Sequence, residues 1–316
     1  MGMNIESMLY LQEKGHLSAK KNKVLDVGPQ NLYNCTEAQI RAFVKRQGAT
    51  VREKVLEKEA KRLEYFSTPR PGERTTFFSE IADLTAVEYC AFDVCPAPKT
   101  EILDLNFDLL PIRHRERYDV VLNFGTSEHV FNQWNCFTII HDATKVGGII
   151  YCVLPATGYL DHGYFCYTPV FFKDIASSNE YEIVDWFFAP AGQNIISEMG
   201  FDVRVNDDYL RSRSAGANQA DDRIPCLNIH AVMRKTRTAP FCCSLEIATS
   251  HSAIDEEMAR RYIGGRLDTN PRSGAPAHRS IVDSELQQIY RSNSWRLTAP
   301  LRALASTLRR IQGRYS

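Results

Sequence analysis

Seven short apolar runs recur along the chain, and they constrain its fold more than any other feature. They are KVLDVG (23–28), VEYCAFDV (87–94), EILDLN (101–106), YDVVLNFG (118–125), GIIYCVLP (148–155), EIVDWFF (182–188) and CLNIHAVMRK (226–235). The first five are continuous rather than alternating, which is typical of strands that helices cover on both faces. The sequence therefore predicts an α/β fold with a mostly parallel sheet of seven strands, flanked by helices.

A charged segment, residues 36–72, separates the first two runs and is too long for an ordinary strand-to-helix connection. Thr36 with Gln39, and Thr50 with Glu53, have the spacing of capping boxes, so we expect two helices there. This helical insertion either folds over the sheet as a lid or projects as a solvated decoration.

The 316-residue chain has no net formal charge, but its charges are unevenly distributed. Residues 286–316 hold six Arg and no acid, which leaves about −6 on residues 1–285. We therefore expect no nucleic-acid partner. Nine Cys without CxxC pairs are typical of reduced thiols in a cytoplasmic protein. We find neither a signal peptide nor a run of about 18 apolar residues.

The sequence predicts a domain over residues 1–240, followed by a linker and a basic helical tail over residues 241–316. Gly, Pro and Arg dominate residues 264–279, as in flexible linkers. The tail beyond them has an apolar stripe at helical spacing, which comprises Leu297, Leu301, Leu304, Leu308 and Ile311. Such a basic amphipathic helix binds an anionic membrane as a peripheral element, docks on a protein partner, or packs on its own domain.

Polar residues stand at the expected carboxyl ends of the first three strands, where open parallel sheets bind ligands. Asp26 and Gly28 end the first strand. Asp93 ends the second, where a carboxylate can accept both hydroxyls of a ribose. Asp104 and Asn106 end the third and suit the amino edge of a purine.

The fourth strand ends in a denser polar group within NFGTSEHV (123–130), namely Asn123, Gly125, Glu128 and His129. These side chains either line a ligand site or have ordinary structural roles. In the second case Glu128 caps the next helix and His129 packs as a satisfied core histidine.

Together these motifs resemble class I S-adenosylmethionine-dependent methyltransferases. The match rests on VLDVG, the acid Asp93, YDVV, SEHV and KVGGIIYCVLP, and it covers roughly residues 15–237. NFGTSEHVFNQWN, HDATKVGG and GYLDHGYF resemble more narrowly a bacterial subgroup associated with surface-polysaccharide biosynthesis. The resemblance implies a Rossmann-like fold, S-adenosylmethionine as cofactor, and O-methylation of a small-molecule or glycan acceptor.

The resemblance also implies which residues hold the cofactor: Asp26, Gly28, Gln30, Asp93, Asp104, Asn106, Asn123, Gly125 and Glu128. One departure concerns the glycine loop, which reads DVGPQN where the family has DxGxGxG. Pro29 fixes φ and removes a backbone donor, so this loop cannot cradle the cofactor in the usual way. We expect Gln30 or Asn31 to supply the contact instead.

Methyl transfer to a hydroxyl needs a base, and histidine titrates near neutrality. His162 lies in the loop GYLDHGYFCYTP after the fifth strand, and we expect it to be the base, oriented by Asp161. His129 is the second catalytic candidate, whereas His141 is expected to be structural. Since no short ligand pair such as HxxxH occurs, the sequence predicts no metal.

Six aromatic residues near this loop either stack on a sugar ring or fill the core beneath it: Tyr159, Tyr164, Phe165, Tyr167, Phe171 and Phe172. The alternative function is a non-catalytic adaptor of the same fold that acts through its basic tail. A nicotinamide-dependent oxidoreductase is disfavoured because GxGxxG is absent.

Overall fold

The computed structural model describes residues 2–18, 22–32, 35–47, 76–159, 161–190 and 226–246. All of these belong to a compact unit of residues 1–252. The predicted tail helix and the part of the helical insertion after residue 47 lie outside the described residues, so both stay predictions. No described helix has the length and apolar character that crossing a membrane requires.

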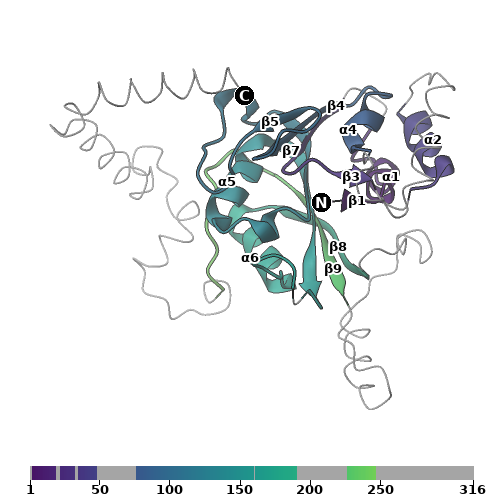
Figure 1. The fold of residues 1–316 in the computed structure, drawn as a ribbon. Coiled ribbons are helices and arrows are strands. Elements are labelled where there is room, and N and C mark those ends of the chain that lie inside the picture. The colour runs from purple at the N-terminus through teal and green to yellow at the C-terminus, as the bar shows by residue number, and fades with distance from the viewer. Residues whose placement is uncertain are drawn as a thin grey trace, which may run out of the picture. The chain divides into compact units, whose positions relative to one another are not determined.

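A single sheet of seven strands forms the centre of the described unit (Figure 1). Its strands are β2 (Lys23–Asp26), β4 (Glu88–Asp93), β5 (Thr100–Ile102), β6 (Tyr118–Phe124), β7 (Thr144–Thr157), β8 (Glu182–Pro190) and β9 (Leu227–Arg234). Their order is β5-β4-β2-β6-β7-β9-β8, and β9 is antiparallel to both of its neighbours, whereas the other pairings are parallel. The predicted mostly parallel seven-stranded sheet is confirmed.

Within the described residues, five α-helices cover the two faces of this sheet (Figure 1). They are α1 (Glu6–Glu13), α2 (Glu37–Arg46), α4 (Phe78–Ala82), α5 (Gln133–Ala143) and α6 (Pro169–Asn179). Two smaller strands, β1 (Gly2–Met3) and β3 (Asn31–Leu32), pair with each other in parallel beside them.

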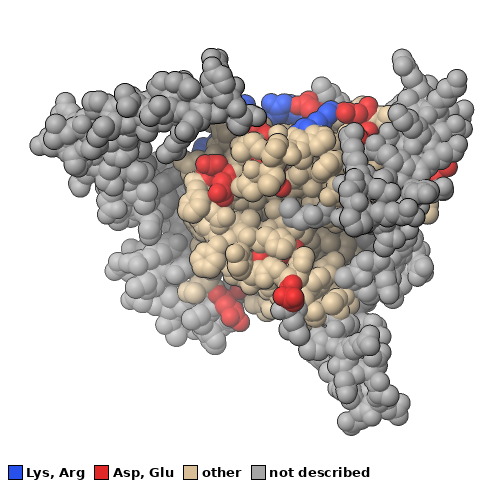
Figure 2. All heavy atoms as spheres, in the orientation of Figure 1, with Lys and Arg blue, Asp and Glu red and all other residues tan. Residues whose placement is uncertain are grey.

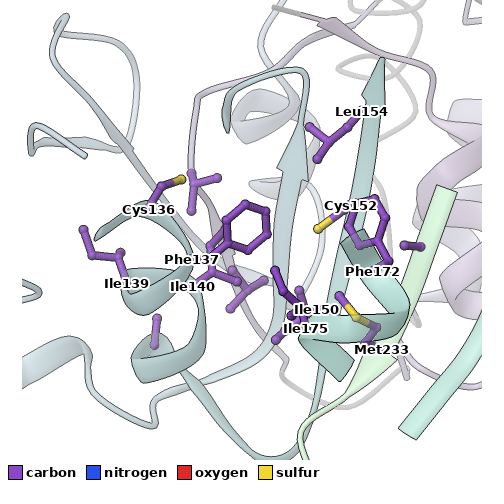
Figure 3. Close-up of a cluster of buried hydrophobic side chains, with 14 of the residues drawn as sticks. Cys136, Phe137, Ile139, Ile140, Ile150, Cys152, Leu154, Phe172, Ile175 and Met233 are labelled. Carbon is purple, nitrogen blue, oxygen red and sulfur yellow. The ribbon is translucent and has the colours of Figure 1, made fainter. Parts of the chain in front are cut away.

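Two hydrophobic clusters show that adjacent strand residues face opposite layers, because side chains alternate along a strand. Val24 packs in one cluster with residues of α1, α2 and α4, such as Phe43. Leu25 packs in the other with residues of α5 and α6, such as Phe137 and Phe172 (Figure 3). Burial on both faces explains why these strands appear as continuous apolar runs.

Helix α2 is the described part of the predicted insertion, and its capping box is confirmed. Thr36 Oγ1 accepts from Gln39 N at 3.3 Å, and Gln39 Oε1 accepts from Thr36 N at 2.8 Å. The helix buries Ile40, Phe43 and Val44 in the core. Helix α2 therefore packs in the core, while the lid or solvated decoration expected of residues 36–72 stays a prediction.

A topological switch point lies between β2 and β6, which are adjacent and parallel. The chain leaves β2 toward the layer of α2 and α4, but it leaves β6 toward the layer of α5. Sheets of this kind bind ligands where the connections diverge in this way, at the carboxyl ends of the strands.

The described surface on the face shown in Figure 2 is mostly uncharged, with Lys and Arg gathered along one edge.

Candidate functional site

The turn after β6 is built by Asn123, which is fully buried at the end of the strand. Its Nδ2 donates to Ser127 Oγ at 2.9 Å, and its Oδ1 accepts from Ser127 N at 3.2 Å. Gly125 takes a φ of +65°, which glycine adopts without strain. Asn123 thus fixes the short 3-10 turn η2 (Ser127–His129), which carries two further predicted site residues.

The loop after β7 packs directly on this turn. Tyr164 N donates to Glu128 O at 2.7 Å, and Tyr167 Oη donates to Ser127 Oγ at 2.9 Å. Gly163 has a φ of +71°, and a Cβ at this position would stand 2.9 Å from Glu128 Cγ. A glycine is therefore required for so close an approach. The contact brings His162 beside the turn.

Glu128, His129 and His162 form a compact group that we name the Glu128 cluster. Glu128 Oε1 lies 3.6 Å from His162 Nε2 and 3.9 Å from His129 Nε2. The carboxylate is 1% exposed, whereas the side chains of His129 and His162 are 43% and 50% exposed. The two imidazole rings meet edge to face with centroids 4.8 Å apart.

Burial dominates the electrostatics of the cluster. It raises the pKa of the Glu128 carboxyl to about 7, because the charged form loses its hydration. Burial, and then the neighbouring His162, lower the pKa of His129. Within the described residues, Glu128 Oε2 is buried and has no hydrogen-bond partner. The structure thus brings together three of the predicted site residues around one unsatisfied carboxylate.

The geometry corrects one expectation for this region and bears on another. Helix α5 is capped by Asn132, whose Oδ1 accepts from Asn135 N at 3.1 Å, and so Glu128 is not the helix cap. The carboxylate that faces His162 is Glu128, whereas Asp161 is exposed and makes no ion pair with it among the described residues. Glu128 is thus the described carboxylate nearest to His162 in the ion pairs observed, and the orienting role expected of Asp161 stays a prediction.

The loop after β2 is closed by Gln30, which is fully buried. Gln30 Nε2 donates to Gly28 O at 2.7 Å and to Phe124 O at 2.8 Å, so both amide hydrogens tie this loop to the end of β6. In the described part of the chain, Gln30 Oε1 has no partner. Gln30 is left with one acceptor and no donor for a ligand.

Asp26 lies at the end of β2 with no exposed surface. Tyr89 Oη donates to its Oδ2 at 3.1 Å, and its Oδ1 has no partner within the described residues. Burial raises the pKa of Asp26 well above its usual range, although the hydrogen bond from Tyr89 opposes the shift.

Asp93 ends β4 as predicted, and it is only partly buried. Its Oδ1 accepts from Cys95 N at 2.8 Å. Strand β5 ends at Ile102, so Asp104 and Asn106 lie in the turn beyond the strand rather than at its end. Asn106 accepts two hydrogen bonds from Asn132, which join this turn to the start of α5.

Most of the predicted aromatic platform lies in the core. Tyr167 and Phe172 are buried, and Phe165 and Phe171 pack against the same cluster. Tyr159 is half-buried, and its Oη donates to Asn228 Oδ1 at 2.6 Å.

Two exposed rings remain beside the Glu128 cluster. Tyr164 is 70% exposed and meets Phe131, which is 77% exposed, edge to face at 6.1 Å. Sequence analysis missed Phe131, although its position two residues after His129 is a usable signal.

His141 has the structural role that the sequence predicts. It lies in α5 and is 1% exposed. Its ring nitrogens lie 2.6 Å from Tyr181 Oη and 2.6 Å from Ala239 O. All nine Cys are free in the structure, and Cys35, Cys136 and Cys152 are buried.

Comparison with known proteins gives only distant likenesses. No protein-family model and no curated protein match the chain. One similar solved structure is an S-adenosylmethionine-dependent methyltransferase from Archaeoglobus fulgidus, with 12% identity, a TM-score of 0.38, and coverage of 73% of this chain and 94% of that one.

Another is phosphoethanolamine N-methyltransferase 2 from Haemonchus contortus in complex with S-adenosyl-L-methionine, with 10% identity and a TM-score of 0.37. That match covers 73% of this chain and 53% of that one. An O-methyltransferase from Brevibacillus brevis matches with 12% identity and a TM-score of 0.33, over 74% and 73% of the two chains. Scores this low support no inference about function, which must come from the site itself.

Proposed function

We propose that the chain is an S-adenosylmethionine-dependent methyltransferase that O-methylates a sugar or glycan intermediate of surface-polysaccharide biosynthesis. The observation that carries the proposal is the Glu128 cluster, a buried carboxylate with two exposed imidazoles at the carboxyl end of β6. This position borders the switch point, where sheets with such connections bind ligands. The resemblance of the strand-end motifs to class I methyltransferases supplies the choice of cofactor.

The polar groups near the switch point suit the cofactor in part. Asp93 is partly exposed at the end of β4, where it would accept the ribose hydroxyls. The unpartnered acceptors Asp26 Oδ1 and Gln30 Oε1 suit the ammonium of the amino acid end. Gln30 offers no donor for the neighbouring carboxylate, which must therefore bind elsewhere. Asp104 and Asn106 would face the adenine.

The cofactor supplies a methyl group that is already activated on a sulfonium. In the transfer, a lone pair of the acceptor oxygen forms the new O–C bond, and the electrons of the broken C–S bond leave on sulfur as a neutral thioether. The hydroxyl proton must also depart. The protein therefore has to align the two reactants and activate the hydroxyl. We assign this activation to the Glu128 cluster as a unit.

The choice of a sugar acceptor is supported by the exposed rings of Phe131 and Tyr164. Phe131 comes two residues after His129, and Tyr164 comes two residues after His162, so both rings lie beside the cluster. Their faces can stack on the apolar side of a pyranose. Phe131→Ala and Tyr164→Ala should raise KM for a glycan acceptor about 10-fold and leave kcat nearly unchanged. A loss of kcat alone would contradict this role.

Titration calorimetry with S-adenosylhomocysteine tests the cofactor assignment. We expect micromolar binding to the full chain, and Asp93→Ala should weaken it about 10- to 100-fold through the loss of charge-assisted hydrogen bonds. Asp83→Ala is the control, because Asp83 pairs with Lys99 on the surface. No detectable heat would contradict the proposal and favour a non-catalytic adaptor.

Transfer of a labelled methyl group into fractionated cell extract tests the acceptor. Label in an acid-stable glycan fraction supports the proposal. Label confined to lipid, protein or nucleic acid would overturn the choice of acceptor while leaving the methyltransferase assignment intact.

A further inference from the structure

The three side chains of the Glu128 cluster all carry atoms that can bind a metal ion. One carboxylate oxygen and one ring nitrogen from each histidine lie within 4.8 Å of one another. Glu128 and His129 come from the turn after β6, and His162 comes from the loop after β7. The bond from Tyr164 N to Glu128 O and the close approach of Gly163 hold these two segments together.

The separations within the cluster fit a shared ion better than direct hydrogen bonds. Glu128 Oε1 stands 3.6 Å and 3.9 Å from the two Nε2 atoms, beyond the usual 2.7–3.2 Å of a hydrogen bond. Ligands about 2.0 Å from a tetrahedral Zn²⁺ stand about 3.3 Å apart. The ligand atoms lie within 4.8 Å of one another, and side-chain rotations of the two half-exposed histidines would bring them to this spacing.

The buried carboxylate is a second and independent observation. Glu128 is 1% exposed, and its Oε2 has no hydrogen-bond partner among the described residues. A buried carboxylate normally needs a donor or a cation to offset its lost hydration. No Lys or Arg makes an ion pair with Glu128 in the part of the chain that the structure describes.

The ligand types indicate which class of ion would bind. Mg²⁺ and Ca²⁺ prefer sets made of oxygen atoms, whereas two imidazoles and a carboxylate suit Zn²⁺, Fe²⁺, Co²⁺ or Ni²⁺. Three protein ligands leave at least one coordination position for a substrate, as in catalytic rather than structural zinc sites.

We propose that Glu128, His129 and His162 bind a divalent transition-metal ion of the zinc class. The ion would act as a Lewis acid on the acceptor hydroxyl, so that the proton is released to water and no free imidazole base is needed. This role rests on the proposed methyl transfer, whereas the metal site itself rests on the geometry alone. The proposed metal site replaces two expectations from the sequence, namely that no metal binds and that His162 is the base.

Metal binding by the full chain is tested with Co²⁺ and Zn²⁺ after removal of metal by a chelator. We expect one equivalent per chain, and a visible Co²⁺ spectrum without thiolate charge-transfer absorption. Glu128→Gln, His129→Ala and His162→Ala should each weaken binding at least 10-fold, because each removes one of three ligands. The double variant of both histidines should bind no ion at this site.

Matched controls are His16→Gln and Glu37→Gln, which remove an imidazole after α1 and a carboxylate in α2. Both should bind Co²⁺ as the parent chain does, and circular dichroism should show that all variants are folded. Unchanged binding in the three ligand variants would overturn the site. So would a thiolate signal, which would place the ion on the exposed cysteines.

Failure of this inference is distinguishable from failure of the proposed function. No Co²⁺ or Zn²⁺ binding by the full chain, together with cofactor binding and methyl transfer, would remove the metal site and leave the methyltransferase. One bound ion lost in the ligand variants, together with no affinity for S-adenosylhomocysteine, would keep the metal site and remove the methyltransferase.

Discussion

The loop after β2 and the turn after β6 meet at the same switch point, yet they satisfy their polar groups in opposite ways. In the β2 loop, Gln30 uses both amide hydrogens to tie the carbonyls of Gly28 and Phe124 together. In the β6 turn, Asn123 and Ser127 bond to each other and leave the buried Glu128 Oε2 without a donor among the described residues. The comparison teaches that the end of β2 uses its donors to stabilise the fold and keeps only buried acceptors, Asp26 Oδ1 and Gln30 Oε1, without partners among the described residues, while the end of β6 places an unpartnered carboxylate beside two half-exposed imidazoles.

The largest effect should come from Glu128→Gln, which removes the charge and keeps the shape. We expect methyl transfer to fall about 1,000-fold, as for loss of a group that activates a reactant. Stability should not fall, because the buried carboxylate is destabilised by its lost hydration. Turnover of a labelled cofactor and a thermal melt measure the two effects. A large fall in Tm with normal turnover would show instead that Glu128 stabilises the fold and takes no part in methyl transfer.

The opposite pattern is expected for Gln30→Leu. It leaves two buried carbonyls without donors, so the free energy of unfolding should fall by about 3 kcal/mol in urea titrations. Gln12→Leu is a matched control, since Gln12 Nε2 makes one such bond, to Phe43 O at 2.9 Å, and should lose about 1 kcal/mol. Equal losses would show that Gln30 has no special role at the switch point.

Acid should destabilise the fold through His141, whose ring is buried in contrast to those of the Glu128 cluster. Burial, and then Lys235, lower the pKa of His141 to about 4, while Glu116 opposes the shift. The unfolded chain, with a pKa of about 6.5, therefore binds the proton first as the pH falls. The contribution of neutral His141 to the free energy of unfolding is therefore complete above about pH 6.5. About 2 kcal/mol of this contribution is lost at pH 5.

The measurement is the free energy of unfolding at pH 7 and at pH 5. His141→Gln should flatten this dependence by about 2 kcal/mol. His230, which is also buried and has a pKa lowered to about 3, should keep part of the remaining slope. An unchanged slope in His141→Gln would contradict the assignment.

The smallest effect separates two glycines with the same backbone conformation. Gly15 and Gly163 have φ values of +74° and +71°, but an added Cβ meets nothing within 4 Å at Gly15 and meets Glu128 at Gly163. Both Ala substitutions should cost about 1 kcal/mol for the left-handed backbone. Gly163→Ala should cost about 1 kcal/mol more and disturb Glu128. Equal losses of stability in the thermal melts of the two variants would show that the loop after β7 can shift to accommodate the added Cβ.

The sheet was predictable because its strands are covered on both faces, so burial imprints a continuous apolar run on each of them. The N-terminal helix α1 was missed for a matching reason. It begins after Ile5, which cannot cap it, and its start signal is offset by one residue, since Asn4 Oδ1 accepts from Glu6 N at 3.0 Å. The third strand was placed too late, since β5 is a short edge strand that ends at Ile102.

The site was predictable as a set of strand ends, but the partners within it were not. The sequence pairs His162 with its neighbour Asp161, whereas the structure faces it with Glu128 from the preceding strand's turn. The sequence also could not show that both amide hydrogens of Gln30 bond to backbone carbonyls, so that only its Oε1 is free for the expected cofactor contact. Contacts of this kind depend on how two loops pack.

By itself, the sequence determined the layers of this protein, the positions of its strands and the polar residues at their carboxyl ends, because burial and alternation act on residues close in the chain. Only the tertiary structure decided which of those polar residues are satisfied and which face one another. Glu128 and His162 meet because Gly163 allows one loop to approach the other's backbone, and this long-range packing has no local signature.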